Sequence, residues 1–337
     1  MLGGLFALLA AFTFAINNAT TRRGVLHASV SQAMAITVPM GVPLFLIVVW
    51  PMGALPLLRG FSAMSIFWLS LAGIAHFVWG RYCNYRATKA MGSNLVAPVQ
   101  QWSLVFTLGA AVLFLGEVVT PLRLIGIALV LLGPMLTATG EGSIAGVFRG
   151  KKQATKPAPA RAGGWRPNLV EGYTFALLSS TGYGASPILI SLGLQARGLE
   201  MSLAGGLISY IAATVATFLL LVLWPGQLRH AAMVTPVAAR WFCLAGFTVW
   251  ASQTFRYLAL SVAPVSVVTP IQRLSIVFRV HLSRLINPEH EVFGAEIWIG
   301  TLVSLLGVLA LSISTDLVLS YVPLPDWLVA AAHWSWP

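Results

Sequence analysis

Acidic side chains are scarce in this sequence, and charged residues of either sign are few. The 337 residues include nine Asp and Glu and twenty Lys and Arg, so charged residues make up 9% of the chain. Soluble domains typically contain about 25% charged residues. The composition therefore excludes an ordinary soluble globular protein.

Motifs of soluble enzymes are also missing. The sequence contains no G-x-x-x-x-G-K-[ST], no H-E-x-x-H and no C-x-x-C, so ATP-driven pumping and zinc hydrolysis lack support. Only two cysteines, Cys83 and Cys243, are present, and both lie in apolar stretches, which argues against a disulfide framework and a metal site. We predict no metal, no cofactor and no catalytic residues.

Long apolar stretches fill the chain instead. Hydrophobic residues make up 58% of it, the mean hydropathy is +0.84, and ten stretches have about the 20 residues that a helix needs to cross a bilayer. No segment alternates with period two, which argues against a transmembrane barrel. The sequence predicts an all-α integral membrane protein with ten transmembrane helices. The predicted spans are residues 2–20, 31–50, 65–83, 94–115, 121–138, 172–193, 203–223, 240–259, 266–286 and 294–314.

Two copies of one unit make up the chain. Residues 98–106 read PVQQWSLVF and residues 270–278, 172 positions later, read PIQRLSIVF. The match extends over more than thirty residues in register. Membrane proteins built from two copies of a multi-helix unit typically bind substrate where the copies meet. We predict one five-helix repeat over residues 1–139 and another over 170–315.

A basic linker, residues 140–169, joins the two repeats, and a Trp-rich tail, residues 316–337, follows the second and is expected to lie at the membrane interface. The linker is rich in Gly and Pro and carries six Lys and Arg, which fits a flexible cytoplasmic loop under the positive-inside rule better than nucleic-acid binding. Loops after odd-numbered spans hold most basic residues. This bias predicts a cytoplasmic linker and both termini outside the cytoplasm.

The fourth and fifth predicted spans contain a characteristic pattern: Pro98, the LGE sequence at Leu115 to Glu117, and GxxLxxxG from Gly126 to Gly133. This pattern resembles that of the EamA-like branch of the drug/metabolite transporter superfamily. The resemblance implies ten helices as two inverted five-helix repeats, a central cavity, alternating access and substrates from amino acids to nucleotide-sugars and drugs. It also implies cytoplasmic termini, in conflict with the charge bias.

Corresponding polar triads occur in the third and eighth predicted spans. Within each triad the residues are three and four positions apart, so they share one helix face. An Arg inside a membrane normally faces a cavity or a partner, and the central parts of the spans contain no Asp or Glu to pair with it. An anionic substrate would supply the missing charge; the alternative is that the arginines snorkel to the headgroups. The triads are Arg81, Asn84 and Tyr85, and Gln253, Arg256 and Tyr257.

Further candidates surround the repeated proline. Gln100 and Gln272 each lie two residues after it and either contact the substrate or form interhelical hydrogen bonds. Arg273 extends the cationic set, and Asn17 and Tyr183 are weaker candidates. His76 is expected to be a satisfied core histidine.

We therefore predict a secondary transporter for a small polar, anionic metabolite. The alternatives are an exporter or flippase of amphipathic or lipid-linked compounds, drug efflux, and a membrane-embedded enzyme. The enzyme is the least favoured, because the sequence shows no cluster of His, Asp or Glu that could act as acid, base or metal ligands. Without mid-span carboxylates, facilitated diffusion or exchange is favoured over proton antiport, unless His76 or His281 relays protons. The expected partners are a small-molecule substrate and the lipid bilayer, without nucleic acid. We expect a monomer or homodimer in a bacterial inner (plasma) membrane.

Overall fold

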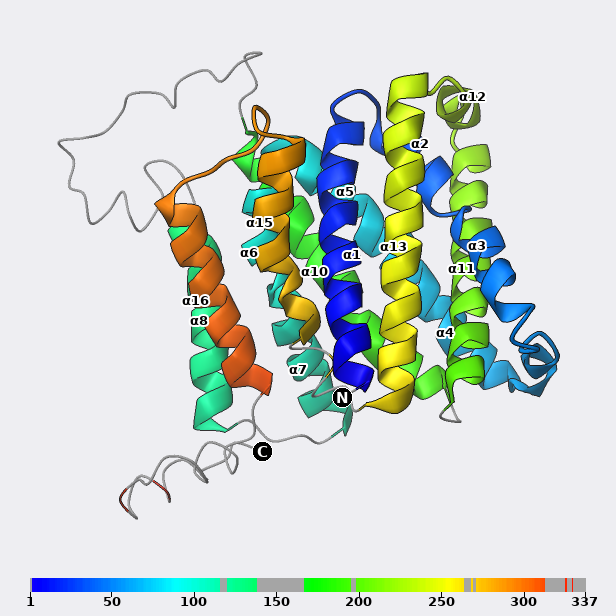
Figure 1. Ribbon diagram of the computed structural model, residues 1–337, viewed down its shortest axis with the longest axis horizontal. Helices are drawn as coiled ribbons and strands as arrows, with labels where there is room; N and C mark the ends of the chain where they lie inside the picture. The colour runs from blue at the N-terminus through cyan, green and yellow to red at the C-terminus, as the bar shows by residue number, and fades with distance from the viewer. Residues whose placement is uncertain are drawn as a thin grey trace.

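Helices make up nearly all of the computed structural model, which describes residues 2–115, 120–137, 167–194, 198–263, 268, 271–312, 325 and 329 (Figure 1). No strand occurs among these residues. The all-α membrane class is therefore confirmed. Most of the predicted linker and tail, together with Glu117 and Pro270, lie outside the described residues.

The first half of the chain forms nine helices and a π-helical turn in its described part. They are α1 (Leu2–Val25), α2 (Val30–Thr37), α3 (Gly41–Val49), the 3-10 helix Pro56–Gly60, α4 (Ala63–Gly73), the π-helical turn Ile74–Gly80, α5 (Arg81–Met91), α6 (Ser93–Gln100), α7 (Trp102–Leu115) and α8 (Pro121–Thr137). The second half forms α10 (Leu169–Gly193), α11 (Leu199–Leu223), α12 (Gln227–Ala232), α13 (Pro236–Val262), α15 (Ser275–Ile286) and α16 (Ala295–Ser312).

Five helical stretches are long and apolar enough to cross a membrane. They are Leu2–Val25, Val30–Val49, Ala63–Met91, Leu169–Gly193 and Leu199–Leu223, and two shorter apolar helices are Pro121–Leu136 and Ala295–Leu311. Every predicted span overlaps a described helix, but several of these helices are too short or too polar to meet the same criterion. The count of ten spans stays a prediction.

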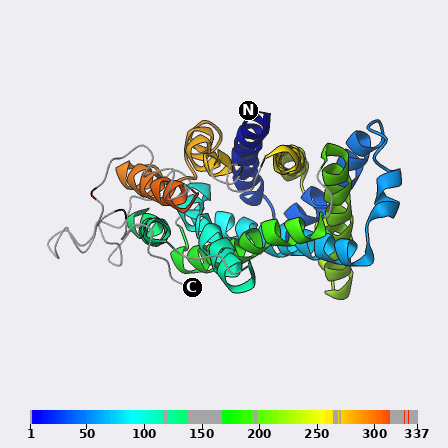
Figure 2. The same cartoon turned by 90° about the horizontal axis from the view of Figure 1, so that it is seen from below.

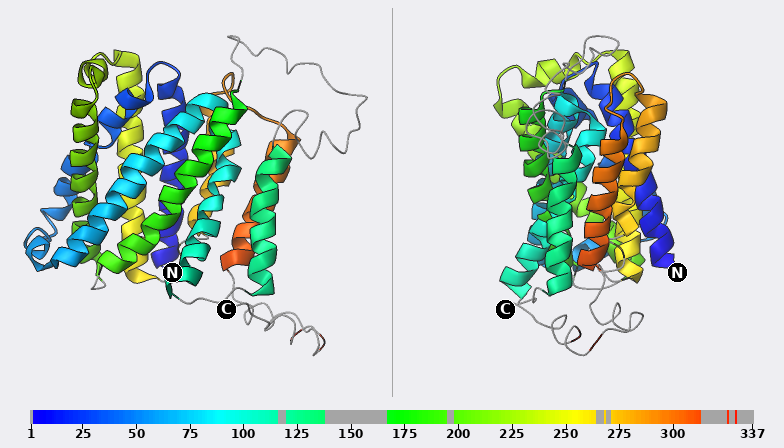
Figure 3. Two further views of the ribbon diagram at one scale, coloured as in Figure 1. Left: turned by 180° about the vertical axis from the view of Figure 1, so that it is seen from behind. Right: turned by 90° about the vertical axis from the view of Figure 1, so that its left-hand side faces the viewer.

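The two halves run in opposite directions through the membrane. Helix α1 starts at the end of the bundle where the N-terminus lies, whereas α10 (green) starts at the opposite end, which we call the linker end because α10 follows the linker in the sequence (Figure 3). The packing is reciprocal: α1 packs along α13, and α10 packs along α4 and α5. The first helix of each half therefore packs against the third span of the other. This arrangement places the inner faces of both halves around one central space. The predicted domain boundaries stay predictions.

Helices α8 and α16 form a separate pair at one side of the bundle (Figure 2). A Cβ added to Gly307 would lie 2.8 Å from the Gly126 carbonyl oxygen, and one added to Gly133 would lie 2.8 Å from that of Gly300. Only glycine leaves the two backbones room for this approach.

Proline breaks the fourth span where the sequence repeat begins. Pro98 has no amide hydrogen, and around it α6 ends at Gln100 and α7 starts at Trp102. The Gln101 amide donates to the Pro98 carbonyl at 3.1 Å, three residues back, and so tightens the last turn. The side chain of Gln100 is thereby placed at a helix end in the centre of the bundle.

A buried polar network joins the two halves at the linker end. Arg22, at the end of α1, donates to the carbonyl oxygens of Thr88 at 2.8 Å and His290 at 2.6 Å. Its Nε lies 3.9 Å from a carboxylate oxygen of Glu291, and both side chains are fully buried. Glu291 also accepts from the Ser93 amide at 2.7 Å at the start of α6. The network therefore ties α1, α5 and α6 to the loop after α15.

Candidate functional site

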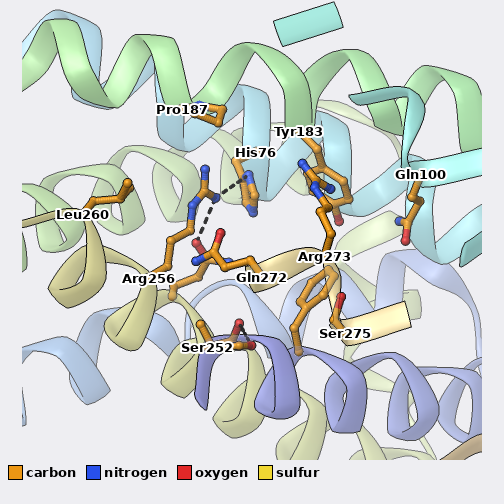
Figure 4. A pocket seen from close by; sticks show the side chains of 13 residues that line it. His76, Gln100, Tyr183, Pro187, Ser252, Arg256, Leu260, Gln272, Arg273 and Ser275 are labelled. Atoms are coloured by element: carbon orange, nitrogen blue, oxygen red, sulfur yellow. Dashed lines mark hydrogen bonds between the residues drawn. The ribbon is translucent and has the colours of Figure 1, made fainter. Parts of the chain in front are cut away.

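A cavity of about 80 Å³ lies between the two halves, at the middle of α1 and α10 (Figure 4). Helices α1, α6, α10, α13 and α15 contribute to its wall, together with the π-helical turn. None of its lining residues among those described is acidic. The lining residues are Ala10, Phe14, His76, Gln100, Tyr183, Pro187, Ser252, Gln253, Arg256, Leu260, Gln272, Arg273 and Ser275.

Arg256 enters the cavity from α13. Its Nη1 is 3.5 Å from Gln253 Oε1, one helical turn earlier, and 3.5 Å from His76 Nδ1 on the π-helical turn. Both distances are at the long limit for hydrogen bonds, so these neutral partners hold the guanidinium only weakly. Tyr257, the third member of the predicted triad, points the other way and donates to Ser209 Oγ at 3.2 Å. Two of the three residues therefore face the cavity.

Arg273 and Gln272 enter just before α15. Arg273 Nε and Gln272 Nε2 are buried and have no hydrogen-bond partner within the described residues. Such donors are costly to leave unpaired, and a ligand that accepts hydrogen bonds would satisfy them. The cavity thus has two guanidinium groups and an unsatisfied amide, with no carboxylate on its described walls.

Arg81 lies elsewhere, although the repeat places it in the triad that corresponds to that of Arg256, where its own counterpart is Gln253. It is 2% exposed, donates to the Thr37 carbonyl at 3.0 Å and to the Tyr210 hydroxyl at 3.1 Å, and lies 5.0 Å from the Phe77 ring centroid. The structure does not bring Arg81 and Arg256 together in this cavity. Neither side chain snorkels, because both are buried.

The two third spans also differ in their helical form. A π-helical turn comes directly before Arg81, whereas α13 is α-helical throughout. His76, inside this turn, lines the cavity. Arg81 contacts Thr37 at the end of α2 and Tyr210 on α11 instead.

The remaining predicted residues lie beside the cavity. Gln100 lines it and donates to Asn84 Oδ1 at 2.8 Å, so the interhelical hydrogen bond weighed for Gln100 is present. Tyr85 donates to Thr37 Oγ1 at 3.3 Å, and Asn17 donates to the Ala245 carbonyl at 2.9 Å. Asn84, Tyr85 and Asn17 therefore do not line the cavity. Tyr183, which was predicted as a weaker candidate, does line it.

Several lining residues were missed by sequence reasoning. Ser252 lies four residues before Arg256, so the helical period alone was a signal for it. His76 was expected to be a core residue, yet it lines the cavity with its ring centroid 4.6 Å from that of Tyr183. No local sequence pattern predicts the π-helical turn that contains His76. Phe14 and Pro187 add small apolar surfaces.

Comparison with known proteins fits this architecture. Residues 1–139 match the model of the EamA-like transporter family. The resemblance to the drug/metabolite transporter superfamily is confirmed for this part of the chain, and the matched family is one of transporters.

Whole-chain comparisons add information on the fold alone. The chain is similar to a protein whose crystal structure has been solved, with a TM-score of 0.50 and 16% identity over 92% of this chain and 94% of the other. The search against curated proteins gave no match. The match over residues 1–139 is therefore the comparison that bears on function.

Proposed function

We propose that the protein is a secondary transporter that carries a small anionic metabolite by alternating access. One observation supports this proposal above the others: Arg256 and Arg273 line a cavity between the two inverted halves whose described walls have no carboxylate. Buried cations without a protein counter-charge are expensive, and a bound anion lowers that cost. We further propose that the protein resides in a bacterial inner membrane, as a monomer or homodimer.

The chemistry of the cavity favours a carboxylate or phosphate. A guanidinium presents parallel N–H donors that match two oxygens of either group. Gln272 and Ser252 offer polar contacts to hydroxyl or amide groups of the same molecule, and Phe14 offers one aromatic face. The small volume favours a compact metabolite over a bulky drug. It also disfavours a long-chain compound at this site.

Transport without ATP is the first expected result. Purified protein in proteoliposomes should exchange a labelled carboxylate or phosphate metabolite against the same unlabelled anion inside, with no nucleotide present. The measurement is counterflow across a panel of metabolite anions, with protein-free liposomes as the control. Binding of an anion without exchange of it, or intrinsic hydrolysis of a substrate, would contradict the proposal.

A second expected result concerns orientation. Helix α10, which follows the linker in the sequence, starts at the end of the bundle opposite the start of α1 (Figure 1), and the six basic residues of the linker resist translocation. A cysteine placed in the linker should therefore resist impermeant thiol reagents in intact cells and react after the membrane is opened. A cysteine at position 2 should show the reverse pattern. Ready labelling of the linker in intact cells would instead support cytoplasmic termini.

A further inference from the structure

A second, larger cavity opens at the side of the bundle, near the linker end. Its volume is about 640 Å³, within the range of small-molecule sites, and it shares no lining residue with the central cavity. The ends of α2, α5, α10 and α11 form its walls. The α5 and α10 ends are joined by a hydrogen bond from the Asn168 amide to the Ala90 carbonyl. We call this space the lateral groove.

The lateral groove is graded from apolar to cationic. Along one wall, Trp79, Tyr82, Arg86 and Lys89 follow one another at intervals of three, four and three residues, so they share one helix face. Of these four residues, Trp79 lies furthest from the end of α5, and its indole donates a hydrogen bond of 3.0 Å to the Leu178 carbonyl. The ammonium group of Lys89 lies at the helix end. Polarity therefore increases from the membrane interior toward the linker end.

The facing wall changes from aliphatic to aromatic toward the same end. Helix α11 runs toward the linker end and contributes Leu220 and Leu221, and Trp224 follows directly after it. Trp224 is 69% exposed. Indole rings at helix ends prefer the headgroup level of a bilayer. Both walls therefore place the boundary between acyl chains and headgroups at the mouth of the groove.

The mouth carries an excess positive charge. Arg86 is neutralised by Glu171, with Nη2 and Oε1 separated by 2.9 Å. Lys89 is exposed, and its one hydrogen bond within the described residues is to the Ala28 carbonyl at 2.9 Å. Two of its three ammonium protons remain for another acceptor. Ser31 lies at the same mouth, in the first turn of α2.

We propose that the lateral groove binds one anionic phospholipid of the surrounding bilayer. Its phosphate contacts Lys89 and the Ser31 hydroxyl, and an acyl chain lies along Val78, Trp79 and Leu221. A soluble anion would use the cationic mouth and leave the apolar walls uncovered. A neutral lipid would cover the walls and leave Lys89 without a counter-charge. An anionic phospholipid satisfies both parts of the site.

Lipid titration of the purified full chain tests this proposal. Delipidated protein in a neutral detergent is titrated with phosphatidylglycerol or phosphatidylcholine of the same acyl chains, and bound lipids are counted by native mass spectrometry. Wild-type protein should bind one phosphatidylglycerol roughly tenfold more tightly than phosphatidylcholine. Lys89→Glu should remove this preference, since it replaces the attraction between a basic residue and the lipid phosphate with repulsion.

Two further variants separate this site from general lipid adhesion. Leu221→Trp fills the apolar wall without changing charge and should weaken binding of both lipids. Arg284→Glu makes the same charge change as Lys89→Glu at an exposed residue near the same end of the bundle, outside the groove, and should leave the tight site intact. Equal losses in Lys89→Glu and Arg284→Glu would overturn the proposal. So would full competition by glycerol phosphate, which would indicate a free anion instead. The assay requires no transport, so its outcome is independent of the proposed function.

Discussion

Replacing Arg256 with Gln is expected to weaken binding of the transported anion by about one to two decades. The substitution removes charge-assisted hydrogen bonds worth roughly 1.5 to 3 kcal/mol while keeping a polar side chain of similar length. Folding should be little affected, because the protein partners of Arg256 are two contacts at 3.5 Å. Arg273→Gln should act in the same direction. Isothermal titration with the substrate found by counterflow measures both effects.

Arg81→Gln is the matched control for this experiment. Arg81 makes short hydrogen bonds to Thr37 and Tyr210 and packs over the Phe77 ring, so its loss should lower thermal stability. The affinity of the protein that remains folded should change little. The sequence repeat alone predicts instead that Arg81 and Arg256 bind the anion jointly. If Arg81→Gln lowers affinity as much as Arg256→Gln at unchanged stability, the joint site is correct and the central cavity is not the whole site.

Glu291→Ala is expected to destabilise the protein by about 3 to 5 kcal/mol. Removing one partner of a buried ion pair leaves the other charge without its partner in a low-dielectric environment. Here the substitution also removes the acceptor for the Ser93 and Asn94 amides at the start of α6. The melting temperature measured by thiol-reactive or tryptophan fluorescence in detergent should fall by about 5 to 10 °C.

The adjacent Glu289 supplies the control. It is exposed, and exposed ion pairs contribute about 0 to 1 kcal/mol, so Glu289→Ala should leave the melting temperature almost unchanged. The double variant Arg22→Met with Glu291→Ala should lose less stability than the two single variants combined, because it no longer buries one charge alone. A melting temperature for Glu291→Ala equal to that of wild type would show that this network does not hold the two halves together.

The third span shows where hydropathy stops being informative. The apolar stretch predicts a helix over residues 65–83, but the helical stretch runs from Ala63 to Met91. Its last part, α5, is polar, and its buried residues include Arg81, Asn84 and Thr88. Arg81 and Asn84 form hydrogen bonds to other helices, namely to Thr37 and Asn18. The hydropathy prediction ends the span too early because it treats every polar side chain as unfavourable inside the membrane. It takes no account of hydrogen bonds to other helices that allow such a side chain to be buried.

The sequence by itself determined the membrane class, the repeat and the set of polar residues from which the cavity is built. These follow from composition and period, which are local properties of the chain. Only the tertiary structure decided which polar residues share a cavity. Arg256 and Arg273 line the cavity together with His76, whereas Arg81 donates to Thr37 and to Tyr210 on α11. The repeat register pairs Arg81 with Gln253, and which face of each helix borders the cavity depends on packing against the other half, which no repeat register encodes.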